Sequence, residues 1–277
     1  MQISTIDETA VLSNGVKMPW LGLGVFGSSE GEEVINAVHY ALEAGYRHID
    51  TAALYENEAG VGQAITTSNV DRKDVFVTSK VWNSDQGYDS TLRAFDESLE
   101  KMGFDYLNLY LVHWPVKGKY KETWRALEKL YKNGRVRAIG VSNFLKHHLE
   151  DLFQSAEIMP MVNQMEFHPY LVQQNLIDFC NDNHIRYEAW SPLMVGKIVD
   201  IEPIKLLAAK YRKTPAQIVL RWDIQKGVVT IPKSSNRERI ISNANIFNFE
   251  ISEEDMKKID GLDKGYRIGA DPDNFNF

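Results

Sequence analysis

The amino-acid sequence predicts an α/β fold of the (β/α)8 TIM-barrel type, with an N-terminal β-hairpin and extra helices. Short runs rich in Val, Ile and Leu alternate with amphipathic runs of helical period, and this alternation repeats eight times along the 277 residues. Strands buried on both faces read as continuous apolar runs, and eight such units in roughly 250 residues make up this barrel. Because no linker interrupts the pattern, we expect a single domain over residues 1–277.

The expected elements follow in a regular order. Asn14 and Gly15 form a turn pair that predicts a short hairpin ahead of the barrel. The eight expected strands each precede a helical stretch and cover residues 20–26, 46–52, 75–81, 106–114, 136–143, 161–168, 186–193 and 228–235. Two helical stretches, 204–213 and 215–227, follow the seventh strand, and a surplus helix is expected at 252–262.

Composition and charge narrow the class of function. With 44% hydrophobic and 25% charged residues the chain resembles an ordinary globular protein, and its net charge of −7 disfavours a phosphate-backbone partner. The N-terminus has two acids and lacks the apolar core of a signal peptide, and no run approaches the ~18 apolar residues of a membrane span. We therefore expect a cytoplasmic protein with no nucleic-acid, membrane or obligate protein partner.

Four polar residues stand at or just beyond the ends of the second, third and fourth expected strands: Asp50, Tyr55, Lys80 and His113. The C-terminal ends of barrel strands ring one mouth, where groups far apart in sequence can meet. On strands of period two Lys80 and His113 point inward, and Asp50 is the nearest counter-charge for the lysine. Each residue alone could be a turn, cap or packing residue. Together they indicate carbonyl reduction, because Lys80 would lower the pKa of Tyr55 and make it a better proton donor.

Longer motifs surround these residues: GYRHIDTA, TSKVW, LYLVHWP, IGVSNF, VNQMEFHP and IPKS. Their combination resembles the aldo-keto reductase family from about Asn14 to the C-terminus, and stretches such as WNSDQGY and EAWSPL most resemble its bacterial glyoxal and methylglyoxal reductases. The resemblance implies a catalytic tetrad made of the same four polar residues, with Tyr55 as the proton donor. It also implies a nicotinamide cofactor, NADP(H), across the barrel mouth.

A cationic cluster follows the last expected strand. Lys233, Ser234, Ser235, Arg237 and Arg239 lie where this strand leads into a helix, and free backbone N–H groups at a helix start favour an anion. A solvated helix cap with surface arginines is the alternative interpretation. By resemblance Lys233, Ser234 and Arg239 hold the 2′-phosphate of NADP(H), with Ser235 beside them.

Further positions match ligands of the family by resemblance. Asn243 is retained near the adenine, although Ser242 replaces a glutamate that many relatives carry there. The positions implied at the nicotinamide, where Trp190 would stack, and along the pyrophosphate are Ser142, Asn143, Gln164, Trp190, Ser191 and Leu193. The positions implied around the substrate are apolar or aromatic: Phe26, Leu54, Trp82 and Trp114.

Loop lengths predict the substrate range. The segments after Trp114 and Leu193 and the tail after Asp263 are short compared with animal members of the family. Loops decide specificity in this fold, so we expect an open, permissive site. The expected reaction is NADPH-dependent reduction of small aldehydes and ketones to alcohols, with methylglyoxal, glyoxal-type dicarbonyls and aromatic aldehydes as substrates.

Two other interpretations remain open. The run GLGVFG at 22–27 forms a G-x-G-x-x-G pattern with Asp50 at the spacing of a Rossmann-type NAD dehydrogenase, although Pro19 and Trp20 stand where its first strand would enter. The other interpretation is a cofactor-loaded partner subunit that uses the same barrel without catalysis. Measured turnover of an aldehyde would separate that subunit from an enzyme.

Histidine spacing predicts no metal site. His147 and His148 are neighbours on one expected helix, so we expect that they do not face a single ion together. His168 and His184 have no partners at ligand spacing. The histidines other than His113 are therefore expected to be structural.

Overall fold

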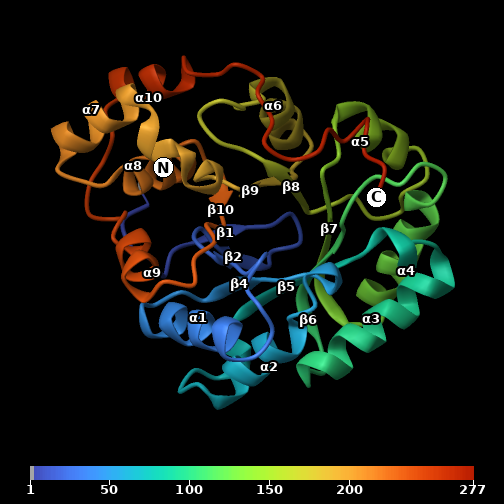
Figure 1. Cartoon of the computed structure of the whole chain (residues 1–277). Coiled ribbons are helices and arrows are strands. Elements are labelled where there is room, and N and C mark those ends of the chain that lie inside the picture. The colour runs from blue at the N-terminus through green and yellow to red at the C-terminus, as the bar shows by residue number, and fades with distance from the viewer. Residues whose placement is uncertain (1–2) are drawn as a thin grey trace.

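The computed structural model describes residues 3–277, and its centre is an eight-stranded parallel sheet (Figure 1). Each strand pairs with the next strand along the chain, from β3 to β10. The strands are β3 (Leu23–Gly24), β4 (His48–Asp50), β5 (Phe76–Val81), β6 (Leu107–Val112), β7 (Val136–Ser142), β8 (Val162–Glu166), β9 (Arg186–Trp190) and β10 (Val229–Thr230).

The sheet closes on itself through backbone hydrogen bonds between its two edges. The N–H of Gly22 donates to the carbonyl oxygen of Thr230 (2.9 Å), and the N–H of Gly24 donates to that of Pro232 (3.2 Å). A Cβ on Gly24 would lie 3.0 Å from the carbonyl oxygen of Ile231, so this glycine allows the edges to approach. The predicted closed barrel is confirmed. The Rossmann-type alternative is wrong, because a doubly wound sheet reverses its strand order and this one does not.

Helices form a ring outside the strands (Figure 1). The helices that follow the successive strands are α1 (Glu32–Glu43), α2 (Glu58–Thr67), α3 (Tyr88–Met102), α4 (Tyr120–Lys132), α5 (Lys146–Phe153), α6 (Gln174–Asp182), α8 (Pro215–Gln225) and α9 (Arg237–Ala244). The predicted extra helices are also present as α7 (Glu202–Tyr211), ahead of α8, and α10 (Glu253–Asp260) near the C-terminus.

Local sequence signals account for where helices begin and end. Helix α8 starts at Pro215 behind Thr214, whose hydroxyl accepts the N–H of Gln217 (3.2 Å), while the side-chain oxygen of Gln217 accepts the N–H of Thr214 (2.9 Å). Helix α3 stops at Gly103, whose φ of 67° is left-handed and costs glycine little. Caps of this kind divide the chain into the alternating units that the apolar pattern predicts.

The predicted N-terminal hairpin is present as β1 (Thr9–Val11) and β2 (Lys17–Pro19). In its turn, Asn14 donates from Nδ2 to the carbonyl oxygen of Arg137, at the start of β7 (2.9 Å). The hairpin therefore lies at the amino-terminal ends of the barrel strands. The carboxyl ends of the strands, where the candidate site lies, are at the other end of the barrel.

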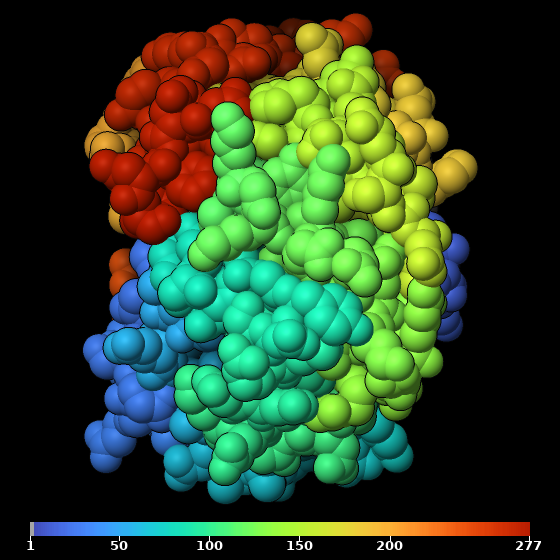
Figure 2. Space-filling view, turned by 90° about the vertical axis from the view of Figure 1, so that its right-hand side faces the viewer, coloured from blue at the N-terminus to red at the C-terminus, as the bar shows by residue number. Residues whose placement is uncertain are grey.

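The C-terminal segment after α10 crosses this other end of the barrel. Figure 2 shows it in red, on the surface at one end of the molecule. Phe277 contacts Trp82, the first residue after β5, and Trp114, the second residue after β6. Within residues 3–277, no helix combines the length and the apolar character that crossing a membrane requires.

Candidate active site

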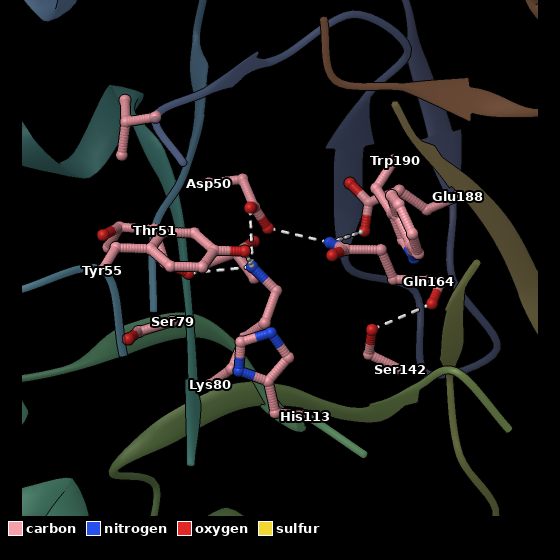
Figure 3. A network of polar contacts seen from close by, with 12 residues as sticks. Asp50, Thr51, Tyr55, Ser79, Lys80, His113, Ser142, Gln164, Glu188 and Trp190 are labelled. Atoms are coloured by element: carbon pink, nitrogen blue, oxygen red, sulfur yellow. Dashed lines mark hydrogen bonds and ion pairs between the residues drawn. The ribbon is translucent and has the colours of Figure 1, made fainter. Parts of the chain in front are cut away.

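The four polar residues that the sequence places at strand ends lie together (Figure 3). Asp50 ends β4, Lys80 lies near the end of β5, His113 follows β6, and Tyr55 ends a short 3-10 helix after β4. The Lys80 ammonium donates to Asp50 Oδ1 (2.6 Å), to the carbonyl oxygen of Thr51 (2.9 Å) and to the Tyr55 hydroxyl (3.4 Å). An ammonium has three N–H donors, so all three are used. The predicted pairing of Lys80 with Asp50 is confirmed.

Burial and charge set the protonation of this cluster. Burial opposes the charge on Lys80, but the attraction of Asp50 and Tyr55 outweighs it and raises the pKa of Lys80. Burial raises the pKa of Tyr55, and the charge of Lys80 offsets this only in part. The expectation that Lys80 lowers the Tyr55 pKa below its ordinary value was therefore wrong in its net direction. Tyr55 is a protonated phenol at neutral pH, with a cation beside its oxygen.

His113 faces Tyr55 as a neutral ring. Burial lowers the pKa of His113 well below its ordinary value, and the nearby charge of Lys80 lowers it further. The rings of Tyr55 and His113 meet edge to face, with centroids 5.8 Å apart. Within the described residues, Nδ1 of His113 is buried without a hydrogen-bond partner. A neutral imidazole and a protonated phenol thus stand together at the barrel mouth.

Gln164 joins the cluster from the far side of the barrel (Figure 3). Its Nε2 donates to Asp50 Oδ2 (2.8 Å) and to Glu188 Oε2 (2.9 Å). We call Asp50, Lys80, Gln164 and Glu188 the buried network. Sequence reasoning missed Glu188, although the available signal was a glutamate in the middle of a barrel strand, on the same face as Trp190.

Asn143 ties three strand ends together. Its Nδ2 donates to the carbonyl oxygen of His113 (3.0 Å) and to Ser142 Oγ (3.1 Å), and its Oδ1 accepts from Trp190 Nε1 (2.9 Å). The Ser142 hydroxyl donates in turn to the carbonyl oxygen of Gln164 (2.9 Å). Asn143 has a φ of 65°, a left-handed conformation that is uncommon outside glycine and is concentrated at functional sites.

The segment after β9 also contains residues in the left-handed backbone conformation. Ser191 has a φ of 54°, and Leu193 precedes Met194 and Val195, whose φ values are 52° and 53°. These residues lie just beyond Trp190, at the carboxyl end of β9. The structure thus brings the residues implied for the nicotinamide and pyrophosphate to one side of the mouth.

The cationic cluster lies at the junction of β10 and α9. Asn236 caps α9, since its Oδ1 accepts the N–H of Arg239 (2.9 Å), and Ser234 Oγ accepts the N–H of Asn236 (3.2 Å). The Lys233 ammonium lies 3.9 Å from Glu33, and the Arg239 guanidinium has no ion pair with any residue from 3 to 277. An exposed lysine and arginine beside a helix N-terminus form a donor set that fits a phosphate group.

The other residues of this cluster have different surroundings. The N–H of Ser29 donates to Glu33 (3.0 Å) and lowers the pKa of that carboxyl, and the side chain of Ser235 contributes to the same lowering. Arg237 pairs with Glu43 (3.4 Å). On α9, Asn243 is buried, and the carbonyl oxygen of Ser242 accepts from Gln217 Nε2 (2.9 Å). Arg237 is thus held by a partner of its own, whereas Arg239 is not.

Aromatic side chains surround the polar cluster, as the sequence predicts. The Phe26 ring lies 5.0 Å from the Tyr55 ring, and the Trp82 ring lies 5.1 Å from the His113 ring. Phe26 is 65% exposed, and Leu54 is also exposed. The side chains on the outer side of the phenol and the imidazole are therefore apolar rings that are partly open to solvent.

The C-terminal tail adds two further rings. Phe277 stacks on Trp82 with centroids 5.7 Å apart, and Phe275 lies 5.1 Å from Trp114. The side chain of Asn83 donates to the carbonyl oxygen of Phe277 (3.0 Å). The expectation of an open site with few walls was therefore wrong at this side, because a short tail suffices to bring two phenylalanines over the mouth. We call the five rings of Phe26, Trp82, Trp114, Phe275 and Phe277 the aromatic rim.

Two histidines anchor this tail. Asp273 Oδ1 lies 2.8 Å from His147 Nε2 and 3.4 Å from His148 Nε2. The expectation that these neighbours do not face a single ion together was wrong in its geometry, because one ligand atom each of His147, His148 and Asp273 lies within 4.8 Å of the others. The N–H of Leu145 donates to His148 Nδ1 (3.2 Å), which leaves the proton of the neutral ring on Nε2. In this form His148 Nε2 offers no lone pair to a metal ion.

Gly269 and Glu166 hold the tail across Trp190. The N–H groups of Ile268 and Gly269 donate to the Glu166 carboxylate (2.5 and 3.2 Å). A Cβ on Gly269 would overlap the ring of Trp190. The tail therefore covers one edge of the ring that is implied to stack on the cofactor.

Comparison with known proteins agrees with this geometry. The aldo/keto reductase family model matches residues 20–264. Glyoxal reductase of Bacillus subtilis (strain 168) is 58% identical over 274 residues, which cover 99% of each chain. Methylglyoxal reductase DkgA of Salmonella typhimurium (strain LT2) is 46% identical over 268 residues, which cover 95% of this chain and 96% of that protein. The crystal structure of a Gox0644 mutant in complex with NADPH has a TM-score of 0.93 at 43% identity, covering 97% of this chain and 98% of that one.

The family match spans most of the barrel, and the donor set at β10 and α9 fits the phosphate of the cofactor bound by the solved relative. The chain therefore belongs to the aldo/keto reductase family, and it is an NADP-dependent oxidoreductase.

Proposed function

We propose that the protein reduces small aldehydes and ketones to alcohols with NADPH, and that Asp50, Tyr55, Lys80 and His113 perform the chemistry. The observation that carries this proposal is the Lys80 ammonium, which lies 3.4 Å from the Tyr55 hydroxyl while Asp50 holds it at 2.6 Å. A fixed cation beside the phenol oxygen stabilises the phenolate that proton donation leaves behind.

When bound, NADPH supplies a hydride to the carbonyl carbon. Negative charge then develops on the carbonyl oxygen, and Tyr55 donates its hydroxyl proton to that oxygen, so that an alcohol forms. The phenolate left on Tyr55 lies beside Lys80, whose charge compensates it. His113 is neutral, so it can donate a ring N–H to the same oxygen without adding a charge to the site.

The same proposal assigns the cofactor ligands. Gln164 has one free group at the mouth, Oε1, because both of its amide hydrogens are used within the buried network. It would accept the N–H of the nicotinamide carboxamide. Lys233, Ser234 and Arg239 would hold the 2′-phosphate, and the Arg239 guanidinium, which forms no ion pair within residues 3–277, supports this assignment. Because barrel, tail and cofactor ligands all contribute, residues 1–277 act as one domain in this proposal.

The aromatic rim supports small reactive carbonyls as substrates. Apolar rings bind a substrate without directional polar contacts, so the reactivity of the carbonyl decides the rate more than side-group recognition does. We propose methylglyoxal, glyoxal-type dicarbonyls and aromatic aldehydes as substrates, and the first two are in keeping with the relatives named glyoxal reductase and methylglyoxal reductase. Free sugars would be poor substrates, because the rim offers them few hydrogen bonds.

Replacement of Tyr55 by phenylalanine tests the proposal. Tyr55→Phe should lower kcat for methylglyoxal by at least ~10²-fold, the usual scale of general-acid catalysis, and leave the Kd of NADPH near wild type. The rates are measured at saturating NADPH, and the Kd is measured by fluorescence titration. Substantial reductase activity in this variant would remove Tyr55 from its proposed role.

A further inference from the structure

A column of polar side chains continues below the mouth into the interior of the barrel. His48, Thr78 and Glu188 are fully buried there, one step below Asp50, Lys80 and Trp190 on the same faces of β4, β5 and β9. Branched apolar side chains ordinarily fill this layer, and a buried ionisable group is costly unless it is paired. The burial of these three polar side chains therefore suggests that they have a specific role.

Glu188 is the member of this column that touches the site (Figure 3). Its Oε2 accepts from Gln164 Nε2 (2.9 Å), and the same Nε2 donates to Asp50 Oδ2 (2.8 Å). The other carboxyl oxygen, Oε1, lies 3.6 Å from His48 Nε2 and has no hydrogen-bond partner among residues 3–277. His48 Nε2 also lies 3.2 Å from Thr78 Oγ1.

A count of charges shows which form Glu188 takes. The cluster holds two carboxyls, Asp50 and Glu188, but one ammonium, and Lys80 pairs with Asp50. The facing rings add no cation, because burial lowers the pKa of His48 to about 3 and that of His113 well below its ordinary value. Burial, together with the charge of Asp50, raises the pKa of Glu188 to about 8. Glu188 is thus a neutral carboxylic acid at pH 7.

In the neutral form one carboxyl oxygen still accepts a hydrogen bond from the Gln164 amide, and this oxygen is Oε2. The other oxygen, Oε1, makes no hydrogen bond with residues 3–277. Asp50 accepts the second hydrogen of the same amide. Because Gln164 Nε2 faces Asp50 and Glu188, the side-chain oxygen Oε1 faces the other way, toward the mouth. If the amide were reversed, Oε1 would face the Asp50 carboxylate, and the two oxygens would repel each other.

We propose that Glu188 is a positioning residue that, together with Asp50, fixes the amide of Gln164 in one orientation, with its oxygen presented to the carboxamide of the cofactor. This inference rests on the proposed placement of the nicotinamide at Gln164. Glu188 itself does not touch the cofactor. It restricts Gln164 to the role of acceptor, and a carboxamide N–H is the group that such an acceptor selects.

A cofactor analogue tests the inference by binding alone. In 3-acetylpyridine adenine dinucleotide phosphate a methyl group replaces the carboxamide NH2, so the analogue cannot donate to Gln164. Wild-type protein should bind NADP+ about tenfold more tightly than this analogue, the scale of one hydrogen bond. In Glu188→Leu the ratio of the two Kd values should fall below the wild-type value, because only Asp50 is then left to hold the Gln164 amide in this orientation.

Two variants serve as controls. Glu188→Gln keeps an oxygen that accepts from Gln164 and should restore the wild-type ratio. Asp223→Asn also removes a buried carboxyl, one that accepts from the Thr230 hydroxyl (2.7 Å) outside the buried network, and should leave the ratio unchanged. An unchanged ratio in Glu188→Leu would overturn the inference, as would a loss of discrimination in Glu188→Gln.

A measurement on the wild type keeps the inference testable if Glu188→Leu does not fold. Both side-chain amide hydrogens of Gln164 should exchange slowly with deuterium in NMR spectra, because both are buried hydrogen-bond donors. Exchange as fast as that of an exposed glutamine would overturn the fixed orientation. If wild-type protein binds NADP+ and the analogue equally while these hydrogens are protected, the placement of the nicotinamide fails and the fixed amide stands. The activity of Tyr55→Phe tests the proton donor, and it affects neither the analogue binding ratio nor the exchange of the Gln164 amide hydrogens.

Discussion

The buried network and the aromatic rim share one barrel mouth but are held by different forces. The buried network is made of hydrogen bonds and an ion pair of 2.6–2.9 Å, and the Lys80 side chain has no exposed surface. The aromatic rim is made of ring contacts with centroids about 5–6 Å apart, and 53% of Phe277 is exposed. Polar contacts of this kind are directional, whereas ring contacts tolerate small shifts.

This difference predicts that the reaction and the choice of substrate depend on different residues. A buried ion pair fails when one partner is removed, because the other charge is left without compensation. An apolar wall can change in size or move while the polar cluster beneath it stays intact. We therefore expect changes in the buried network to act on kcat and stability, and changes in the aromatic rim to act on KM.

Removal of the Lys80 charge should have the largest effect. Lys80→Met leaves Asp50 buried without a cation and should cost about 3–5 kcal/mol in the free energy of unfolding, besides lowering kcat by ~10²-fold or more. Both are measured, by urea unfolding and by steady-state kinetics. The double variant with Asp50→Asn should recover part of the stability but none of the rate. A wild-type kcat in Lys80→Met would show that the reaction does not depend on the buried network, and would contradict the difference proposed between the network and the aromatic rim.

Glu188 makes the stability of the buried network depend on pH. Between its ordinary value of 4.5 and its raised pKa of about 8, the folded protein holds a proton that the unfolded chain has released. Stability therefore falls as pH rises through this window, by up to about 1.4 kcal/mol per pH unit. Glu188→Gln should remove this slope, measured as the difference between the unfolding free energies of the two proteins from pH 5 to 8. Parallel curves would show that Glu188 is ionised in the folded protein.

Changes in the cationic cluster at the start of α9 should have an effect of intermediate size. Arg239→Ala should weaken NADPH binding by roughly tenfold or more and leave NADH binding nearly unchanged, because a hydrogen bond to a charged group contributes roughly 1.5–3 kcal/mol. Arg237→Ala is the matched control, since Arg237 pairs with Glu43. Equal losses for NADPH and NADH in Arg239→Ala would show that the arginine acts on the helix and not on the 2′-phosphate.

The sequence predicts the barrel and the polar cluster because both depend on local periodicity. Apolar runs of strand length fix the strands, and period two decides that Lys80 points inward toward Asp50. Glu188 was missed because it meets the cluster only through Gln164, whose contact with Asp50 joins strands that lie 114 residues apart in the sequence. The net pKa direction of Tyr55 was missed for a related reason, since the depth of burial depends on packing that no local pattern records.

The path of the tail could not be read from the sequence at all. Residues after α10 have no helical or strand period, so nothing local indicates that Phe275 and Phe277 return to Trp82 and Trp114. The anchor at Asp273 likewise depends on histidines that lie more than a hundred residues earlier in the chain. We therefore expect substrate specificity to depend on the part of the chain whose path is least predictable from the sequence.

The aromatic rim should produce the smallest effect and the most selective one. Phe277→Ala removes a ring stacked on Trp82 and should raise KM for an aromatic aldehyde such as nitrobenzaldehyde by about threefold to tenfold, the scale of one aromatic pair. KM for methylglyoxal should change less, because this substrate is too small to fill the same space, and kcat should stay near wild type for both. Steady-state kinetics at saturating NADPH measure all four values.

A tail residue outside the aromatic rim provides the control for this prediction. Tyr266→Ala removes an exposed ring from the tail that makes no ring contact with Trp82 or Trp114, so it should leave both KM values unchanged. If Phe277→Ala lowered kcat for both aldehydes equally, the rim would be shaping the tetrad itself. The aromatic rim and the buried network would then act together on the reaction, and reaction and specificity would not depend on different residues in this barrel.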